Sequence, residues 1–341
     1  MQIQLVIPGL LWPASQGRHP AQDLALPALS RLIGHAQVDH SAPLAPDLWL
    51  ANRFGLTPES APLAALRRLG EDGLEPMRPG SAWLCADPVN LHFAREHLLL
   101  ADAGDLALTE NEADALTASL NETFSDLGRF EAGAPDRWYL QLATVPQARF
   151  FPLTDVTSRP VGHFLPEGPD AAQWARAMNE AQIILHNHPV SAVRESSGRA
   201  TANSIWFWGA GPLPAEGLAP PAPRILAEGL VARGLARAAG VEPGRPAFPE
   251  SGPDTLIVLE DLLRPALYLD IDGWSAALQG LEERWFAPLL AGLKSRRIAR
   301  LQLAAPGDRA TLSLGVEAGE LWKFWRKPRG IETLGSGVES P

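Results

Sequence analysis

The sequence contains very little of several residue types, and each shortage excludes a class of protein. Cys85 is the single cysteine in 341 residues, so the chain cannot form an internal disulfide and a reducing compartment is expected. Lysine occurs only at Lys294, Lys323 and Lys327, and arginine supplies the remaining positive charge. We interpret this arginine bias as a sign of genomic base composition and not of function.

Positive charge as a whole is also scarce, because 39 acidic residues outnumber 29 lysines and arginines and leave a formal charge of −10. A nucleic-acid partner is therefore not expected, since phosphate binding needs a basic surface. No apolar run approaches the roughly 20 residues that a membrane-spanning helix requires, and residues 1–7 lack the basic start of a signal peptide. These shortages predict a soluble, cytoplasmic protein of bacterial type with no membrane span.

The apolar content of 46% provides ample material for one large domain or for two. Short apolar runs of buried-strand length recur along the chain and alternate with patterns of helical spacing. Such alternation indicates an α/β fold, with a sheet that helices cover on both faces. The strand candidates of this kind are residues 2–7, 255–259, 266–270, 300–304 and 310–314.

The pattern of strand and helix candidates changes after a cluster of prolines and glycines at residues 75–80. Thr109 and Glu112 have the spacing of a capping box and predict the start of a helix. Further strand candidates lie at 82–86, 97–101 and 137–142. This mixture indicates a separate α+β domain inserted into the first fold.

This change of pattern divides the chain into three predicted regions. Residues 76–199 are predicted to form the inserted α+β domain. Residues 1–75 and 200–330 are predicted to form the α/β core together, although they are not continuous in sequence. Residues 331–341 are predicted to be a tail.

The densest group of polar side chains lies between residues 186 and 209, where two histidines, an arginine, an amide and a glycine turn fall together. His186 and His188 are two residues apart, which is not the spacing of the helical histidine pairs that bind metal. Both are weak candidates for acid–base catalysis, and His188 is also a candidate for ligand binding. The alternative is that a histidine here caps a helix.

Arg194 is the main candidate for anion binding in this group, because a guanidinium can hold a phosphate or a carboxylate through two hydrogen bonds. Asn203 and the backbone of Gly209 could add neutral donors to the same pocket. The alternative is a structural ion pair between Arg194 and Glu180 or Glu195.

A second polar cluster contains Asp87 and Asn90, which we include among the candidates for ligand binding. The alternative for both is a solvated loop. Their neighbour Cys85 lies in an apolar strand candidate and is expected in the core, not as a nucleophile.

The segment from Trp322 to Lys327 mixes aromatic and cationic side chains. Such a mixture is typical of a segment that docks on a protein partner or at an interface. Packing of a final helix on the sheet, with its cations outward, would produce the same pattern. We therefore expect either a partner site or a packed helix at residues 322–327.

Three stretches of the sequence carry a family resemblance. The first is a strand that ends in Asp102 and a small-residue turn, followed by a helix. The second joins His188 and Arg194 to Asn203, and the third contains residues 229–234 and 270–273. In this order they are similar to the archaeal-type, cofactor-independent phosphoglycerate mutases, which belong to the alkaline-phosphatase-like superfamily.

Other segments are similar to the RpfE-type regulatory proteins of the same group, namely residues 7–13, 85–89, 186–209 and 322–326. The resemblance implies an alkaline-phosphatase-like, mostly parallel sheet with helices on both faces and an inserted α+β domain. It also implies a two-metal site for phosphoryl transfer, whose carboxylates and histidines lie on loops at the C-terminal ends of strands.

Several positions at which the resemblance implies a metal ligand or the nucleophile hold residues that cannot serve. Pro8 and Gly9 follow the first strand in place of a metal-binding aspartate. Pro46 stands where the nucleophilic serine is implied, and Ala305-Pro306 stands where an Asp-His pair is implied. We therefore expect neither a bound metal nor a cofactor.

The leading hypothesis is a phosphoglycerate-mutase-like protein that has lost the metal ligands and the nucleophile. Its role would be regulatory, or the sensing of a small phosphorylated or otherwise anionic metabolite. One alternative is an active, metal-independent enzyme of mutase or phosphatase type that uses His186 or His188. Another is a protein-interaction module that works through residues 322–327. The sequence favours a protein that is not an enzyme.

Overall fold

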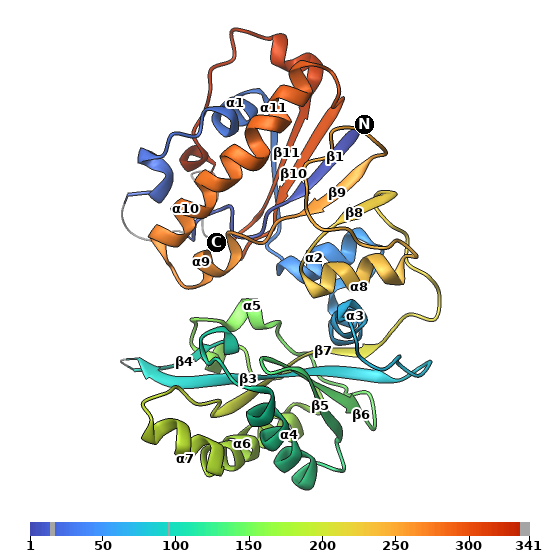
Figure 1. Ribbon diagram of the computed structural model, residues 1–341, viewed down its shortest axis with the longest axis vertical. Helices are drawn as coiled ribbons and strands as arrows, with labels where there is room; N and C mark the ends of the chain where they lie inside the picture. Colours follow the sequence, from blue (N-terminus) through green and yellow to red (C-terminus); the bar gives the residue numbers. More distant parts are fainter. Residues whose placement is uncertain (14–17, 95, 335–341) are drawn as a thin grey trace. The chain divides into compact units, whose positions relative to one another are not determined.

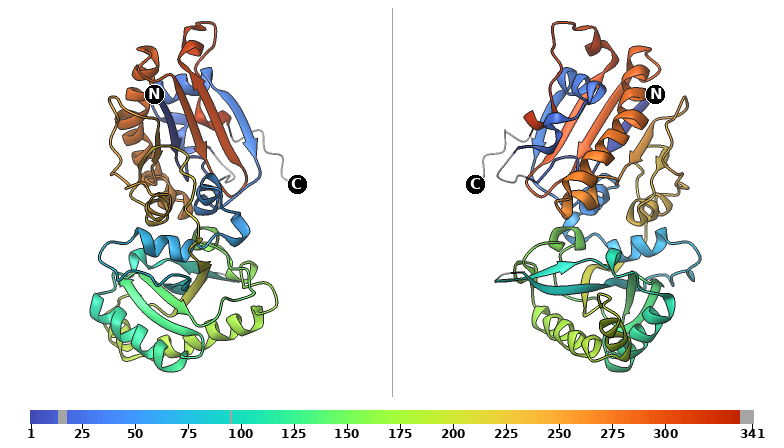
Figure 2. Two further views of the ribbon diagram at one scale, coloured as in Figure 1. Left: turned by 90° about the vertical axis from the view of Figure 1, so that its right-hand side faces the viewer. Right: turned by 60° about the vertical axis from the view of Figure 1, so that its left-hand side comes forward.

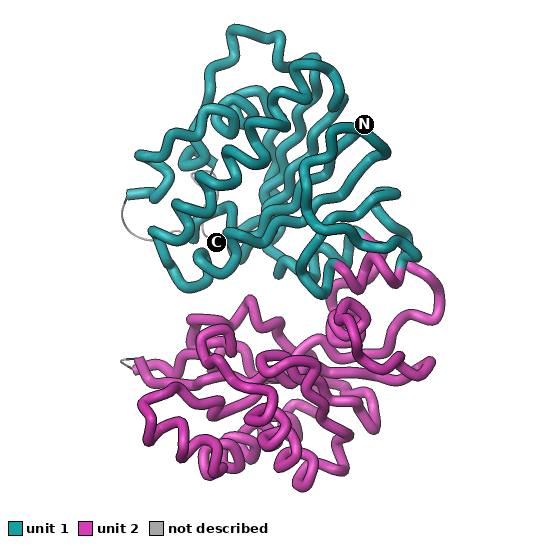
Figure 3. Tube along the Cα trace, in the orientation of Figure 1, with its two compact units in different colours: residues 1–53, 219–232, 239–341 teal, residues 54–218, 233–238 magenta. Residues whose placement is uncertain are grey.

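The computed structural model describes residues 1–13, 18–94 and 96–334, and the chain divides into two compact units (Figure 3). The first unit comprises Met1–Arg53, Ala219–Ala232 and Ala239–Pro341. The second unit comprises Phe54–Leu218 and Arg233–Ala238. One division falls inside helix α8, Leu230–Ala238.

The second unit is wider than the inserted domain predicted at residues 76–199. Helix α3, Leu63–Gly70, precedes that range and strand β7, Ser204–Pro212, follows it, yet both belong to this unit. They belong there because β7 pairs with a strand inside the range and α3 packs against β7. Of the predicted tail, Ile331–Thr333 forms a short 3-10 helix, and residues 335–341 lie outside the described part of the chain.

A six-stranded sheet forms the framework of the first unit. Its strands are β1 (Gln2–Val6), β2 (Gln37–Ser41), β8 (Arg224–Leu226), β9 (Thr255–Val258), β10 (Arg300–Ala305) and β11 (Thr311–Glu317). They lie in the order β2-β11-β10-β1-β9-β8. The pairs from β10 to β8 are parallel, whereas β11 and β2 extend the sheet in antiparallel fashion.

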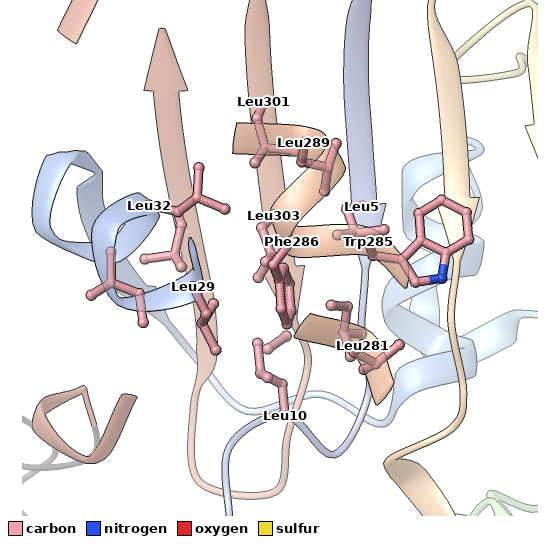
Figure 4. Packing of buried hydrophobic residues seen from close by; sticks show 14 of the residues in the cluster. Leu5, Leu10, Leu29, Leu32, Leu281, Trp285, Phe286, Leu289, Leu301 and Leu303 are labelled. Carbon is pink, nitrogen blue, oxygen red and sulfur yellow. The ribbon is translucent and has the colours of Figure 1, made fainter. Parts of the chain in front are cut away.

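Helices cover both faces of this sheet. Helices α1 (Pro27–His35), α10 (Ile271–Leu281) and α11 (Ala287–Lys294) lie on the apolar face (Figure 2). Between them and the strands, Phe286 lies among Leu10, Leu29 and Leu303 (Figure 4). Helix α2 (Pro46–Arg53) lies beside the opposite face, where Arg53 Nη2 donates to Gln4 Oε1 of β1 at 3.2 Å.

A buried carboxylate joins helix α1 to the π-helical turn η5 (Glu282–Phe286) that connects α10 to α11. Glu282 is only 6% exposed and accepts hydrogen bonds from Ala28 N at 2.5 Å and Leu29 N at 3.0 Å. These donors belong to the first turn of α1, where the helix itself offers no acceptor. The negative charge also suits the positive end of the helix dipole. Glu282 therefore caps α1.

The second unit is built on an antiparallel sheet. Its strands are β3 (Ala82–Ala94), β4 (His97–Ala101), β5 (Gly128–Ala134), β6 (Arg137–Leu142) and β7. The order is β4-β3-β6-β5, and β7 also pairs with β3. Helix α3 lies on one face, and α4 (Glu110–Thr123), α6 (Ala171–His186) and α7 (Pro189–Ser196) lie on the other (Figure 1).

The predicted class, a mostly parallel α/β sheet with a separate antiparallel α+β part, is confirmed. The capping box is confirmed as well, because Thr109 and Glu112 each accept a hydrogen bond from the other's backbone N–H. The strand predicted at residues 266–270 is wrong, since Leu263–Leu267 forms helix α9. A five-residue apolar run has no periodicity that distinguishes a strand from a buried helix. In the described residues, no helix is both long and apolar enough to cross a membrane.

The buried ion pair between Arg67 and Asp87 organises the interior of the second unit. Two hydrogen bonds of 2.7 Å join the guanidinium to the carboxylate, and the two side chains are 8% and 2% exposed. Asp87 also accepts from Trp138 N and Trp208 Nε1, while the guanidinium faces the rings of Tyr139 and Trp208. Burial alone would lower the pKa of Arg67, but Asp87 holds that pKa well above its usual value. Each charge is therefore stable only in the presence of the other.

Replacing Arg67 with methionine would leave Asp87 buried without its partner. We expect Arg67→Met to lower the free energy of unfolding by about 3–5 kcal/mol in urea denaturation. The matched control is Arg233→Met, whose pair with the exposed Asp72 lies at the surface and should contribute far less. The double variant with Asp87→Leu should recover part of the loss. Equal losses for Arg67→Met and Arg233→Met would contradict this role.

Candidate functional site

The carboxyl ends of four parallel strands, β10, β1, β9 and β8, meet at one edge of the first unit's sheet. In open α/β sheets, ligands bind in the crevice outside this edge. The loops that follow these four strands therefore form the first candidate site. The positions implied for metal ligands after the first strand and after strand 300–304 also lie on these loops.

The position directly after β1 at which the resemblance implies a metal-binding aspartate carries no coordinating side chain. Pro8 and Gly9 follow Ile7 there, and Gly9 has a φ of +78°. A Cβ at Gly9 would lie 2.5 Å from the carbonyl oxygen of Leu262, so a larger residue has no room. The carbonyl oxygen of Gly9 accepts a hydrogen bond from Trp274 Nε1 at 2.8 Å. Backbone packing therefore occupies the place at which the mutase resemblance implies an aspartate.

Acidic side chains gather at the same edge, after β9 and β8. Burial and, after it, the charges of Asp47, Glu228 and Asp261 raise the pKa of Glu260 to about 7. A Cβ at Gly229 would lie 2.3 Å from Glu260 Oε1, so backbone closely encloses this carboxyl group. Glu260 is therefore a group that gains or loses its proton near neutral pH.

The side chains at this edge do not match a two-metal centre. Such a centre needs carboxylates and histidines that converge on the metal ions. Here β10 ends at the buried Ala305 and is followed by the buried Pro306, and Asp261 forms an ion pair with Arg284 at 2.9 Å. Within residues 1–13, 18–94 and 96–334, no three His, Cys, Asp or Glu side chains come together in a way that could hold a metal ion.

Sequence analysis missed Glu228, Glu260 and Asp261 as members of this edge. The signal was present for two of them, because Glu260 and Asp261 directly follow the apolar run 255–259, which is correctly predicted as a buried strand. Charged residues that end a parallel strand lie where a ligand would bind. Glu228 has no such signal, because its strand, β8, is only three residues long.

The two histidines lie at the junction between helices α6 and α7. His186 is the last residue of α6 and is exposed. His188 is the N-cap of α7, where its Nδ1 accepts a hydrogen bond from Val190 N at 3.1 Å. Partial burial lowers the pKa of His188, which keeps the ring neutral and able to accept. The helix-capping interpretation is confirmed for His188.

Arg194 is buried, with 1% of its surface exposed. Its Nε donates to Ala200 O at 2.7 Å, its Nη1 contacts the Glu112 carboxylate at 2.8 Å, and its Nη2 donates to Leu106 O. The ion pair therefore forms with Glu112 and not with Glu180 or Glu195. This arrangement holds α7 against the start of α4, and it directs all three guanidinium nitrogens to groups within the unit.

The other predicted ligand-binding residues lie along the pairing of β3 with β7. Asn203 donates to Leu91 O and accepts from Leu91 N, while Asn90 donates to a backbone carbonyl just before β7. Asp87 lies in the ion pair with the α3 arginine, and Gly209, with φ of +70°, touches the backbone of α3. These four residues are brought together, but their contacts hold two strands and a helix in place. They share no partner with Arg194.

The aromatic side chains of residues 322–327 are exposed. Trp322, Phe324 and Trp325 are 67%, 88% and 65% exposed, and the last two rings meet edge to face at 5.3 Å. Lys323 and Arg326 both pair with Glu320, which orients the cations beside the rings. The alternative of a packed final helix is wrong, because Ala318–Trp322 is a 3-10 helix and the rings do not pack on the sheet.

Replacing Glu260 with glutamine should change the pH dependence of stability. The folded-state pKa of about 7 lies above the ordinary value of a glutamate, so the folded protein binds this proton more tightly than the unfolded chain. The stabilisation that protonated Glu260 contributes is therefore fully present at low pH and is lost as the pH rises through 7. The free energy of unfolding of Glu260→Gln, relative to that of the wild type, should therefore be about 2.5 kcal/mol higher at pH 8 than at pH 5 in urea denaturation.

The exposed carboxyl group of Glu283 provides the control for this experiment. Glu283→Gln should differ from the wild type by the same small amount at both pH values. A stability difference for Glu260→Gln that does not vary with pH would show that Glu260 titrates normally.

No family model matches the chain. It is similar to a 2,3-bisphosphoglycerate-independent phosphoglycerate mutase from Methanothrix thermoacetophila, with 34% identity over 107 residues, which are 31% of this chain and 27% of the relative. A second mutase of this description, from Methanothermobacter thermautotrophicus, is 33% identical over 125 residues, 36% of this chain and 31% of the relative. The matched segments thus span less than a third of either relative's length.

Among solved structures, the PH0037 protein from Pyrococcus horikoshii superposes with a TM-score of 0.50 over 93% of this chain and 87% of its own. The sequence identity is 14%, so this likeness concerns the fold alone. The comparisons therefore relate part of the sequence to cofactor-independent phosphoglycerate mutases and the whole architecture to a known α/β fold.

Proposed function

We propose that this chain is a phosphoglycerate-mutase-like protein of RpfE type that does not perform two-metal phosphoryl transfer. Its role in this proposal is regulatory, through the binding of a small anionic ligand, and its location is the cytoplasm, where its single cysteine suits a reducing environment. The matched segments of mutase sequence support the relationship to the mutases. The composition of the strand edge supports the loss of the reaction.

This proposal rests on the edge of the first sheet at which the carboxyl ends of β10, β1, β9 and β8 meet. In the first unit, Gly9, which follows β1, packs against the backbone of Leu262, and β10 ends at the buried Ala305, which the buried Pro306 follows. The edge does hold carboxylates, and burial, followed by the charges of Asp47, Glu228 and Asp261, raises the pKa of Glu260 to about 7. The two positions at which the resemblance implies metal ligands, directly after β1 and at the end of β10, thus hold residues that cannot coordinate a metal through a side chain, which supports the proposed loss of two-metal transfer.

The alternative of a metal-independent enzyme has less support. His186 is exposed at a helix end, and one ring nitrogen of His188 is committed to the helix cap. A general base needs a partner or substrate within hydrogen-bonding reach of a free ring nitrogen. The hydrogen bond of His188 to Val190 N supplies a structural role for that histidine instead.

Metal content and turnover provide the direct test. We expect purified protein to contain far less than one equivalent of Mn, Zn or Mg, and to show no mutase or phosphatase turnover with 3-phosphoglycerate, with or without added metal. The mutase of Methanothrix thermoacetophila, prepared in parallel, is the positive control. Stoichiometric metal together with turnover would overturn the proposal, and turnover that survives a chelator but not His188→Ala would favour the metal-independent enzyme.

A second candidate function is protein docking through the exposed aromatic segment, residues 322–327. Three rings that are each at least 65% exposed form an unusual apolar patch, beside cations that suit an acidic partner. The rest of this chain supplies such a surface, because its formal charge is −10. We therefore propose that a second copy of the chain is the partner, which makes docking a form of self-association.

Sedimentation velocity over a range of protein concentrations tests this second candidate. We expect the wild type to self-associate, more weakly at high salt because charge contributes, and Phe324→Ala to reduce the association at unchanged thermal stability. Phe93→Ala is the matched control, since Phe93 is 80% exposed in the other unit. A wild type that stays monomeric at its highest soluble concentration, or equal effects of both variants, would exclude self-association through this segment.

A further inference from the structure

The face of the first sheet opposite its apolar core contains a hollow of about 300 Å³. Strands β2, β11, β10 and β1, which are neighbours in the sheet, form its floor, and helix α2 forms one wall. All its lining residues belong to the first unit. This volume is at the lower end of the range for ligand pockets, which suits one small molecule.

The floor of the hollow is polar and regular. The strand register places Gln4, Gln302, Gly315 and Gln37 in one row across four adjacent strands. Ser313 adds a hydroxyl group in the next row. Primary amides and hydroxyls both donate and accept hydrogen bonds, so such a floor can match the edge of a heteroaromatic ring.

Gly315 gives the hollow its depth. A Cβ added at this position would meet no heavy atom within 4 Å, so the space above it is open. Its neighbours in the lining include Ala304 and Ser313, which are also small. The row of glutamines is therefore interrupted by a gap that a ring system can enter, and a larger residue at position 315 would close it.

The wall and the rim add an aromatic surface and positive charge. Trp49 of α2 lines the wall, and the exposed Arg53 and Arg300 line the rim, where Asp39 is the only acidic residue in the lining. Arg53 is oriented by its hydrogen bond to Gln4. A tryptophan provides a stacking surface for a planar base, and arginine binds phosphate through paired hydrogen bonds.

We infer that this hollow binds a purine nucleoside monophosphate. The base stacks on Trp49 and presents its edge to the amides of Gln302 and Gln37, because the Gln4 amide is already bonded to Pro221 O and Arg53. The phosphate lies between Arg53 and Arg300. Although the chain has a formal charge of −10, two arginines and only one acidic residue line the hollow. This local positive charge favours an anionic ligand. This ligand class would serve the proposed regulatory role, and the biological meaning of binding rests on that role. The binding itself does not, because the hollow and the carboxyl edge of the sheet are different surfaces.

Isothermal titration calorimetry with adenosine 5′-monophosphate, in the presence of a chelator, tests the inference on the full chain. We expect one site, with adenosine bound at least about tenfold more weakly because the phosphate contacts are missing. Ribose 5-phosphate and inorganic phosphate should give no measurable binding. Arg53→Gln should reduce the affinity for the monophosphate towards that for adenosine and leave the adenosine affinity unchanged.

Gly315→Phe should abolish binding by filling the hollow, at a thermal midpoint no lower than that of the wild type, because phenylalanine suits a strand better than glycine does. Gly319→Phe is the matched control, since its Cβ also meets nothing within 4 Å but lies outside the hollow. If Gly315→Phe fails to fold, the exposed Arg53→Gln carries the test. Binding that survives Gly315→Phe, equal affinity for ribose 5-phosphate, or no binding at all would overturn the inference. None of these results bears on metal content or turnover, which test the proposed function separately.

Discussion

Strand β1 is hydrogen-bonded to β10 on one side and to β9 on the other, and the first unit depends on this central position. Its inward residues Ile3 and Leu5 are completely buried, so the chain that leaves the strand must turn in a confined space. Glycine with a positive φ meets that requirement, and it excludes a coordinating side chain at the same point. The loops after β8 and β9 contribute carboxylates to this edge, where burial and then the neighbouring charges raise the pKa of Glu260 to about 7.

Features with a local signal could be predicted from the sequence, and features that depend on distant partners could not. The capping box at Thr109 and the strand at residues 300–304 each depend on a few neighbouring residues, and the structure contains both. Arg194 looked like an anion-binding residue because nothing near it in sequence reveals that Glu112, 82 positions away, neutralises it. Strand β2 is largely exposed at the edge of its sheet and therefore lacks the apolar alternation that would predict it. The hollow depends on the register of four strands, which no single segment encodes.

The site expected for phosphoryl transfer and the hollow proposed for a ligand lie on two different surfaces of the first sheet. The carboxyl edge is acidic and closely packed, whereas the open face carries amides, a tryptophan and two arginines. A protein of this fold that performs no chemistry at the edge could still bind a ligand on the face, because the two surfaces use different residues. Conversely, the residues of the second unit that resemble a binding motif, such as Asn203, secure strand pairing. Resemblance in sequence and the location of a ligand site need not coincide here.

The central position of β1 also has a consequence for synthesis on the ribosome. The partners of β1 on β10 lie almost 300 positions later in the chain, and the carboxylate that caps α1 lies 254 positions after its donor. At about 5–20 residues per second, the first strand waits roughly 15–60 seconds before its neighbours exist. Most of the second unit is one continuous segment, Phe54–Leu218, and emerges whole during this interval. During synthesis β1 thus remains without its two neighbouring strands while the continuous segment Phe54–Leu218 can already fold.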